Sequence, residues 1–143
     1  MTPQLFEKVL VAIDGSEKNR PAVAEALRLG RACGAEIHAV YVIENSTIES
    51  VAGESAGCDV WTVLQKEAAA ALHEAVEESD GMKVETAILE GSPAKEILRY
   101  AAEHAIDLIV LGTQGKKGLE RLLLGSVAET VIRSAPCRVL VVK

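Results

Sequence analysis

The chain has 143 residues, of which 21 are acidic and 15 are basic, so its formal net charge is −6. Hydrophobic residues make up 49% and charged residues 25%, a balance typical of one globular domain of this length. Aromatic residues make up only 3%. An acidic chain with few aromatics lacks the basic surface and the stacking platforms of nucleic-acid binders. We therefore expect one domain over residues 1–143 that binds no nucleic acid.

The expected compartment is the cytoplasm. The N-terminal residues lack the charged and then apolar pattern of a signal peptide, and no apolar run approaches the roughly 18 residues of a membrane span. The cysteines Cys33, Cys58 and Cys137 are odd in number and widely scattered, which argues against a disulfide framework and a zinc site. We expect no membrane contact, no metal ligands from the protein, and Cys33 and Cys137 as small buried apolar residues.

Four apolar runs and one mixed segment alternate with helical patterns along the chain. Residues 9–13, 37–43, 108–111 and 139–142 are apolar runs bounded by turn residues, as strands buried on both faces of a parallel sheet are. Residues 83–89 are more mixed, which predicts an edge strand. The order β-α-β-α-β-α-β-α-β predicts an α/β fold, an open, doubly wound parallel sheet of five strands with four helices.

The helical patterns are amphipathic stripes that can cover such a sheet. Ser92-Pro93 predicts an N-cap followed by proline in the first turn, and Gly34 and Gly81 lie where helices are expected to stop. The first helix has two candidate caps, Ser16 and Asn19. The stripes are Val23, Ala26, Leu27 and Gly30, then Leu64, Ala68, Leu72 and Ala75, then Ala94, Ile97, Leu98, Ala101 and Ala105, and finally Val127, Val131 and Ala135.

A glycine-rich segment, GTQGKKGLERLLLGS, follows the fourth strand at residues 112–126. Its glycines allow the backbone to curl closely around a ligand and to point N–H groups inward. Residues 126–129, SVAE, match the S-x-x-E capping box and predict a helix N-terminus, which attracts anions. Lys116, Lys117 and Arg121 make the segment basic within an acidic protein. These features favour bound phosphate, although ordinary turns, a stabilising cap and solvated basic side chains would use the same residues.

Two common phosphate motifs are absent from the sequence. It has no G-x-x-x-x-G-K-[ST] and, after the first strand, no G-x-G-x-x-G. Ligands of open α/β sheets bind beyond the carboxyl ends of the strands, where Asp14 and Gly112 are expected. The pattern present is G-x2-G-x9-G-S, at Gly112, Gly115, Gly125 and Ser126.

This spacing resembles that of the universal stress proteins, in the subgroup that binds ATP through G-x2-G-x9-G-[ST]. The similarity extends from VLVAIDGSE (9–17) through HAVYVIE (38–44) and GSPAKEIL (91–98) to residues 107–142. It implies a Rossmann-like nucleotide-binding fold with strand order 3-2-1-4-5, whose reversal lies between the first and fourth strands. It also implies that the chain is an ATP-binding regulator of stress responses or signalling.

The resemblance assigns roles to individual residues. Asp14 matches the acidic residue that contacts the nucleoside, and Val42 matches the strand residue beside the adenine. Lys116, Lys117 and Arg121 are further candidates for phosphate contacts. The remaining positions that the resemblance implies are Ala12, Ile13 and Leu111 in the pocket wall, Gly112 against the ribose, and Gly115, Gly125, Ser126 and Val127 toward the phosphates.

The resemblance also implies a homodimer that pairs through the last strand, Arg138–Val142. We expect ATP, or AMP or ADP, with Mg²⁺ held through the phosphates. Because no general base or Walker lysine is evident, we expect a regulator rather than an enzyme, with at most slow hydrolysis. Two alternatives stay open: a nucleotide-independent dimeric interaction module of the same fold, and an AMP-binding sensor.

Several other features are expected to have no catalytic role. Residues 53–57, GESAG, match the G-x-S-x-G of serine hydrolases but do not follow a predicted strand. His38 is expected in a strand, and His73 and His104 on solvated helix faces.

Asp107 begins the fourth strand, at the end of the sheet opposite the ligand, and is expected to be a surface or dimer-side polar group. Trp61 is expected to pack in the core, with closure over the crevice as the alternative. A phosphoryl-accepting receiver domain would need paired acids after the first strand, where only Asp14 is present.

Overall fold

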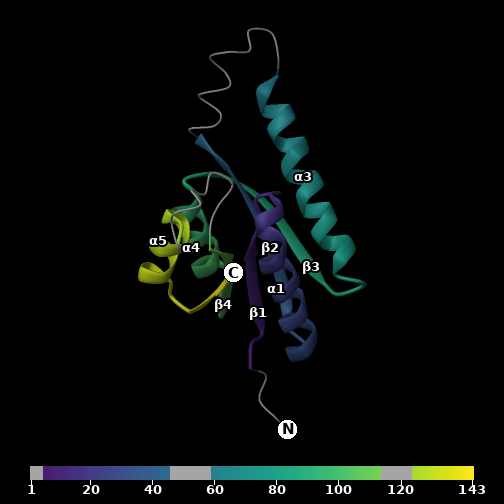
Figure 1. The fold of residues 1–143 in the computed structure, drawn as a ribbon, viewed down its shortest axis with the longest axis vertical. Helices are drawn as coiled ribbons and strands as arrows, with labels where there is room; N and C mark the ends of the chain where they lie inside the picture. Colours follow the sequence, from purple (N-terminus) through teal and green to yellow (C-terminus); the bar gives the residue numbers. More distant parts are fainter. Residues whose placement is uncertain (1–4, 46–58, 114–123) are drawn as a thin grey trace.

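The computed structural model describes residues 5–45, 59–113 and 124–143, which form a parallel sheet with helices on both faces (Figure 1). The strands are β1 (Lys8–Ala12), β2 (Glu36–Glu44), β3 (Val84–Gly91), β4 (Leu108–Gly112) and β5 (Arg138–Val142). The helices are the 3₁₀ turn η1 (Glu17–Asn19), α1 (Arg20–Cys33), α3 (Val60–Glu78), α4 (Pro93–Glu103) and α5 (Ser126–Ser134).

The sheet has five strands in the order β3-β2-β1-β4-β5, and all neighbours pair in parallel. The predicted doubly wound α/β fold and its strand order are therefore confirmed. β1 lies at the centre, with β2 on one side and β4 on the other, so the direction of winding reverses between β1 and β4. β3 is an edge strand with largely exposed residues, as its mixed composition predicts.

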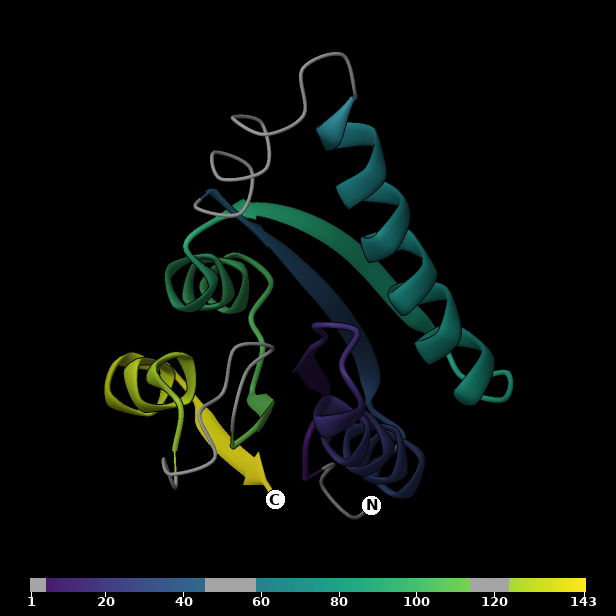
Figure 2. The same ribbon diagram turned by 45° about the horizontal axis from the view of Figure 1, so that its top comes forward.

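Helices α1 and α3 cover one face of the sheet, and α4 and α5 cover the other (Figure 2). Alternate residues of β1 serve the two layers: Val9 and Val11 pack toward α1 and α3, and Leu10 packs toward α4 and α5. All three are fully buried. Because both faces of β1 are buried, its sequence is a continuous apolar run.

The helix boundaries follow most of the sequence signals. Asn19 is the N-cap residue of α1 and Ser16 precedes η1, so each candidate cap begins a helical segment. Gly34 ends α1 with a φ of 67°. Ser92 is the N-cap residue of α4 and Pro93 is its first residue. Ser16 and Ser92 have the extended conformation of an N-cap, whereas Asn19 is helical, and none of the three side chains makes a capping hydrogen bond.

Two helix ends differ from the predictions. α3 ends at Glu78, and Gly81, with a φ of 86°, lies in the turn beyond it. α4 ends at Glu103, so the expectation that Ala105 continues its apolar stripe is wrong. Ala105 is exposed and has a φ of 53°, because the chain must turn sharply there to enter β4. None of the helices within the described ranges is long and apolar enough to span a membrane.

A polar cluster lies under α4, near the amino ends of β2 and β3. His38 is only 4% exposed, and its Nδ1 shares a hydrogen bond of 2.7 Å with the Tyr100 hydroxyl. Its Nε2 lies 2.9 Å from Glu36 Oε1. His104 stacks on Tyr100 with ring centroids 3.7 Å apart and is half-buried, so the expectation that it lies on a solvated face is wrong. His73 is exposed and pairs with Glu77, as expected for a solvated face.

Burial lowers the pKa of His38 below its ordinary value of 6.5, and this effect outweighs the nearby Glu36 carboxylate, which raises it. His104 lowers the His38 pKa further, and Glu85 raises it. The folded protein therefore favours a neutral imidazole. With its hydrogen on Nε2, a neutral ring accepts from the Tyr100 hydroxyl, and among the described residues its Nε2 lies near Glu36 without a hydrogen bond of good geometry.

We predict that the free energy of unfolding decreases as the pH falls below about 6.5, because the unfolded chain then binds a proton that folded His38 does not. The contribution approaches ~1.4 kcal/mol per pH unit between the folded and unfolded pKa values. His38→Gln should remove this part of the slope in urea unfolding measured from about pH 5 to pH 7. His73→Gln, at an exposed position, is the matched control and should keep the slope. Equal slopes for wild type and His38→Gln would contradict the prediction.

Candidate functional site at the reversal of strand order

The carboxyl ends of β1 and β4 leave the sheet next to one another. Val11 and Val110 are the last register pair between these strands, and beyond this pair each strand continues into a different connection. Gly112, predicted to border the crevice, is the last residue of β4, and Asp14, predicted to flank it, lies two positions beyond the end of β1. In an open α/β sheet, such a point of reversal is where ligands bind.

Apolar side chains line the carboxyl edge of the sheet on the α4 and α5 side. Ala12 of β1 and Val42 of β2 are half-buried and pack against the same cluster as Leu111, which is only 3% exposed. Val127, in the first turn of α5, packs against this cluster as well. The structure thus brings four predicted wall and helix residues, Ala12, Val42, Leu111 and Val127, to one apolar cluster, in which Leu111 is buried and the other three are half-buried.

Two further residues extend this cluster, and the sequence analysis missed both. Leu89 lies opposite Val42 in the β2–β3 pairing, and Leu124 directly precedes the N-cap of α5. Both are half-buried in the same cluster. Strand alternation was the available signal for Leu89, because Ala87 and Leu89 share one face of β3. We call Ala12, Val42, Leu89, Leu111, Leu124 and Val127 the apolar wall.

Ile13 lies on the other side of the sheet. Its side chain is 6% exposed and packs with Val11 and Val23 in the α1 and α3 layer. Residues 12 and 13 point in opposite directions because successive side chains of an extended chain alternate. The side chain of Ile13 therefore does not share a face with Ala12 and Val42.

Asp14 is half-buried and held in a compact turn. Its Oδ1 accepts hydrogen bonds from the Ser16 amide, at 2.8 Å, and from the Ser16 hydroxyl, at 2.7 Å. Gly15, between them, has a φ of 80°, a conformation that glycine adopts without strain. Within the described residues Oδ2 has no hydrogen-bond partner. One oxygen thus fixes the carboxylate, and the other can accept a bond from a ligand.

The N-terminus of α5 lies beside the end of β4. The Gly125 amide donates a hydrogen bond of 2.6 Å to the carbonyl of Thr113, which directly follows β4. Gly112, Gly125 and Ser126, three positions of the glycine motif, are therefore close together. The first amides of an α-helix have no carbonyl partner within the helix and attract anions.

The predicted capping box is wrong in its details. Gly125, not Ser126, is the N-cap residue, and its carbonyl accepts the Glu129 amide at 3.0 Å. Ser126 is already helical, and its carbonyl accepts the Thr130 hydroxyl. The Glu129 carboxylate pairs with Arg133 at 2.7 Å instead of reaching back to the N-cap. The helix begins one residue early because Gly125 takes the extended conformation of an N-cap.

Several predicted residues lie outside the described parts of the chain. They include the candidate phosphate contacts of the glycine segment and the serine-hydrolase-like motif. These residues are Gly115, Lys116, Lys117 and Arg121, and residues 53–57 together with Cys58. Among the described residues, no group of three or more His, Cys, Asp and Glu side chains could hold a metal ion.

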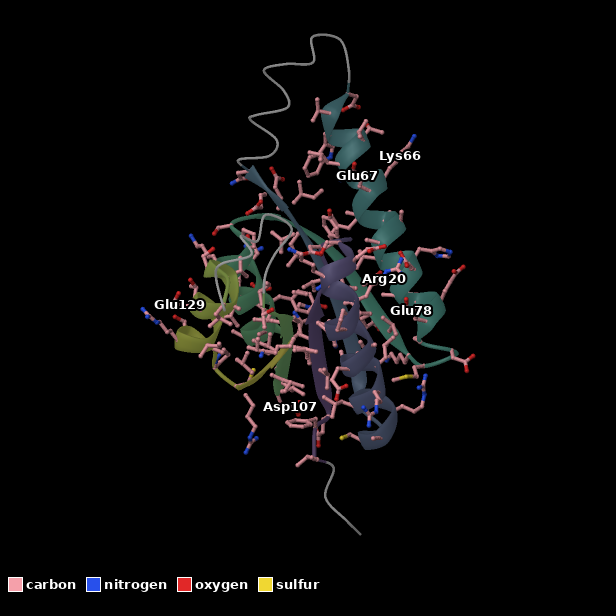
Figure 3. The ribbon with its side chains drawn as sticks, viewed as in Figure 1. Arg20, Lys66, Glu67, Glu78, Asp107 and Glu129 are labelled. Atoms are coloured by element: carbon pink, nitrogen blue, oxygen red, sulfur yellow. The ribbon has the colours of Figure 1, made fainter. Side chains whose placement is uncertain are left out.

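Other residues singled out in the sequence have structural roles. Trp61 is half-buried and packs against the α1 and α3 core, as expected. Cys33 and Cys137 are half-buried in the two apolar layers, rather than fully buried, and burial raises the pKa of the Cys137 thiol. Asp107 lies at the amino end of the sheet (Figure 3), where its carboxylate accepts the amides of Glu7 at 2.8 Å and Lys8 at 3.2 Å.

The family model for the universal stress protein family matches residues 5–143. The chain belongs to this family. It is 41% identical, over 141 residues, to Universal stress protein MJ0531 of Methanocaldococcus jannaschii, with 97% of this chain and 83% of the relative covered. The universal stress protein YxiE of Bacillus subtilis is 34% identical over 148 residues, with 97% and 100% covered.

Solved structures of this universal stress fold agree with the sheet described above. Hypothetical protein MJ0577 superposes with a TM-score of 0.84 at 31% identity, covering 97% of this chain and 96% of its own. A universal stress protein from Archaeoglobus fulgidus in complex with dAMP has a TM-score of 0.70 at 22% identity, with 97% and 99% covered. At that identity the likeness concerns the fold alone.

We predict that Asp107→Ala lowers the free energy of unfolding by about 2 kcal/mol, because two backbone amides lose a charged acceptor. It should leave ligand affinity unchanged, because Asp107 lies at the opposite end of β4 from Gly112. Urea unfolding and a nucleotide titration of the same sample measure the two effects. A change in affinity without a change in stability would contradict the structural role of Asp107.

Proposed function

We propose that this universal stress protein binds an adenine nucleotide, in the first place ATP, at the carboxyl ends of β1 and β4. The observation that carries the proposal is the bond from the Gly125 amide to the Thr113 carbonyl, at 2.6 Å. It holds the N-terminus of α5 beside the strand end where a ligand of this sheet is expected. In the proposed complex, the α5 amides and the Ser126 hydroxyl bind phosphate oxygens.

The apolar wall supports an adenine position. Half-buried apolar side chains at the mouth of a crevice gain stability when an aromatic base covers them. Ala12 and Val42 lie on this wall, and Asp14 follows Ala12 by two positions, so one ligand can touch all three. The proposed contact for the Asp14 carboxylate is a donor group of the nucleoside. Gly112 then borders the ribose, and Gly115, Lys116, Lys117 and Arg121 complete the phosphate site in the proposal.

The proposed role is a nucleotide-dependent regulator with at most slow hydrolysis. The sequence has no G-x-x-x-x-G-K-[ST] motif, and therefore no Walker lysine to stabilise the charge that develops on a transferred phosphate. Mg²⁺ would enter with the phosphates, because this ion keeps several waters and binds substrate phosphates readily.

An AMP-type ligand is the second candidate. The Archaeoglobus fulgidus universal stress protein, which shares this fold, was solved with dAMP. The apolar wall and Asp14 would bind a nucleoside monophosphate equally well. Affinity that increases with the number of phosphates would favour ATP, and equal affinity for AMP and ATP would favour the sensor.

We predict that purified protein binds MgATP in a calorimetric titration and that Asp14→Asn weakens binding about tenfold, since a hydrogen bond to a charged acceptor is replaced by a neutral one. Asp80→Asn is the matched control. Asp80 is exposed with a φ of 50°, which asparagine tolerates, and it lies in the turn after α3. The control should bind as wild type does.

Gly115→Val should abolish binding while the circular dichroism spectrum stays native, because the motif needs a residue without a side chain against the phosphates. Nucleotide released by denaturing the protein as purified identifies the physiological base. Absence of binding at millimolar ATP would overturn the proposal and favour the interaction module that does not use nucleotide.

We also propose a homodimer through β5. β5 is the outer strand of the sheet, and Val139–Val142 are apolar and half-exposed. An apolar edge strand leaves hydrogen-bonding groups that a second copy can satisfy. This proposal does not depend on nucleotide, and it serves both the regulator and the alternative interaction module.

Val141→Lys should convert the dimer into a monomer in sedimentation velocity, because it places a charge in the paired edge. Val141 is half-buried and belongs to neither apolar cluster, so the fold should tolerate the change. Val63→Lys, at a residue of α3 that is 52% exposed, is the control and should remain dimeric. A wild-type monomer, or a dimeric Val141→Lys variant, would contradict the prediction.

A further inference from the structure

Asn19 is a buried polar residue beneath the candidate site. It is 6% exposed and is the last residue of η1, which packs against β4. Its Nδ2 donates to the carbonyl of Ala12, at 2.9 Å, and its Oδ1 accepts the Asp14 amide, at 3.3 Å. The side chain therefore bridges the end of β1 to the residue proposed to contact the nucleoside.

This bridge takes the place of a missing strand contact. The register pairs between β1 and β4 end at Val11 and Val110, while the Ile13 amide still bonds the Val40 carbonyl of β2 at 2.8 Å. The carbonyl of Ala12 thus lies beyond the last pair with β4, and Asn19 satisfies it there. Loss of this partner would leave a half-buried carbonyl unpaired among the described residues, which favours keeping Asn19 in this position.

Asn19 does not serve α1 as an ordinary cap. It occupies the N-cap position, yet its side chain makes no capping hydrogen bond. One reason lies in the sequence: Pro21, the second residue of α1, has no amide to be capped. The side-chain amide of Asn19 is therefore available to bond Ala12 and Asp14. Helix capping does not explain why an asparagine is buried at this position.

A chain of hydrogen bonds runs from β1 to the free carboxylate oxygen. Asn19 fixes the Ala12 carbonyl and the Asp14 amide, and Ser16 fixes Asp14 Oδ1. Only Oδ2 is left for a ligand among the described contacts. The following residue, Arg20, lies on the α1 and α3 side (Figure 3) and pairs with Glu74 of α3 at 3.0 Å at the surface.

We propose that Asn19 is a positioning residue for nucleotide binding, which holds the Asp14 carboxylate at the angle that the nucleoside requires. The inference rests on the proposed function and adds to it a residue that does not touch the ligand. Because Asn19 acts through Asp14, its contribution to affinity exists only while the Asp14 carboxylate is present.

The test is a double-mutant cycle in MgATP affinity, with wild type, Asn19→Ala, Asp14→Ala and the double variant measured by calorimetry. Asn19→Ala should weaken binding about tenfold in the wild-type background, the scale of one well-placed hydrogen bond. In the Asp14→Ala background the same change should alter affinity by less than about twofold. A residue that acts only on the fold would lower affinity equally in both backgrounds.

Ser79→Ala is the matched control for loss of a buried polar group. Ser79 is 1% exposed, and its hydroxyl bonds the Val76 carbonyl at the end of α3, away from the carboxyl edge of the sheet. It should lower the melting temperature and leave the ATP affinity unchanged. If Asn19→Ala does not fold by circular dichroism, Asn19→Ser, which keeps a good N-cap residue, is measured in its place under the same criteria.

The outcomes separate the two proposals. If wild-type protein does not bind MgATP, the proposed function fails, and the role of Asn19 falls with it. If wild type binds but Asn19→Ala binds equally well, only the role of Asn19 is overturned. Equal losses in the two Asp14 backgrounds would also overturn it.

Discussion

The structure depends on the point where β1 and β4 stop pairing. A parallel sheet wound in both directions from a central strand must open at the carboxyl end of that strand, because the two connections leave toward opposite edges. Here the last pair is Val11 and Val110. Beyond this pair the backbone of β1 needs hydrogen-bond partners other than β4. The neighbouring carboxyl ends of the two strands can border a ligand. After β1, the Asn19 side chain supplies hydrogen bonds to Ala12 and Asp14. After β4, the Thr113 carbonyl accepts a hydrogen bond from the Gly125 amide.

The alternation of β1 divides the site into two parts. Ala12 faces the α4 and α5 layer and contributes to the apolar wall, whereas Ile13 faces α1 and α3 and anchors the strand end in the other core. Asp14 then begins the turn that Asn19 and Ser16 hold. In the proposed site, apolar side chains of the α4 and α5 layer, the Asp14 carboxylate and the N-terminus of α5 all contact one ligand. This combination suits a ligand with an aromatic base at one end and phosphate at the other.

The signals of the sequence predicted the doubly wound α/β class, and the family resemblance supplied the strand order. Continuous apolar runs, proline after Ser92 and glycine at residue 34 all matched the observed elements. The site was predicted less completely, for physical reasons. The S-x-x-E pattern cannot reveal that Gly125 takes the cap conformation and that Arg133 attracts Glu129. Ala12 and Ile13 are neighbours in sequence but lie on opposite faces. Contacts between residues that are distant in sequence, such as His38 with Tyr100, leave no local pattern.

An amide NMR titration with MgATP shows whether an adenine nucleotide lies across the ends of β1 and β4 against the N-terminus of α5. We expect the largest shift changes at Ala12, Asp14, Gly112, Gly125 and Val127, because the ligand would lie against these residues. Asp107 and Ser79, near the amino end of the sheet, should change little. Saturable changes confined to the amino end of the sheet or to β5, or no saturable change at all, would show that the nucleotide does not bind there.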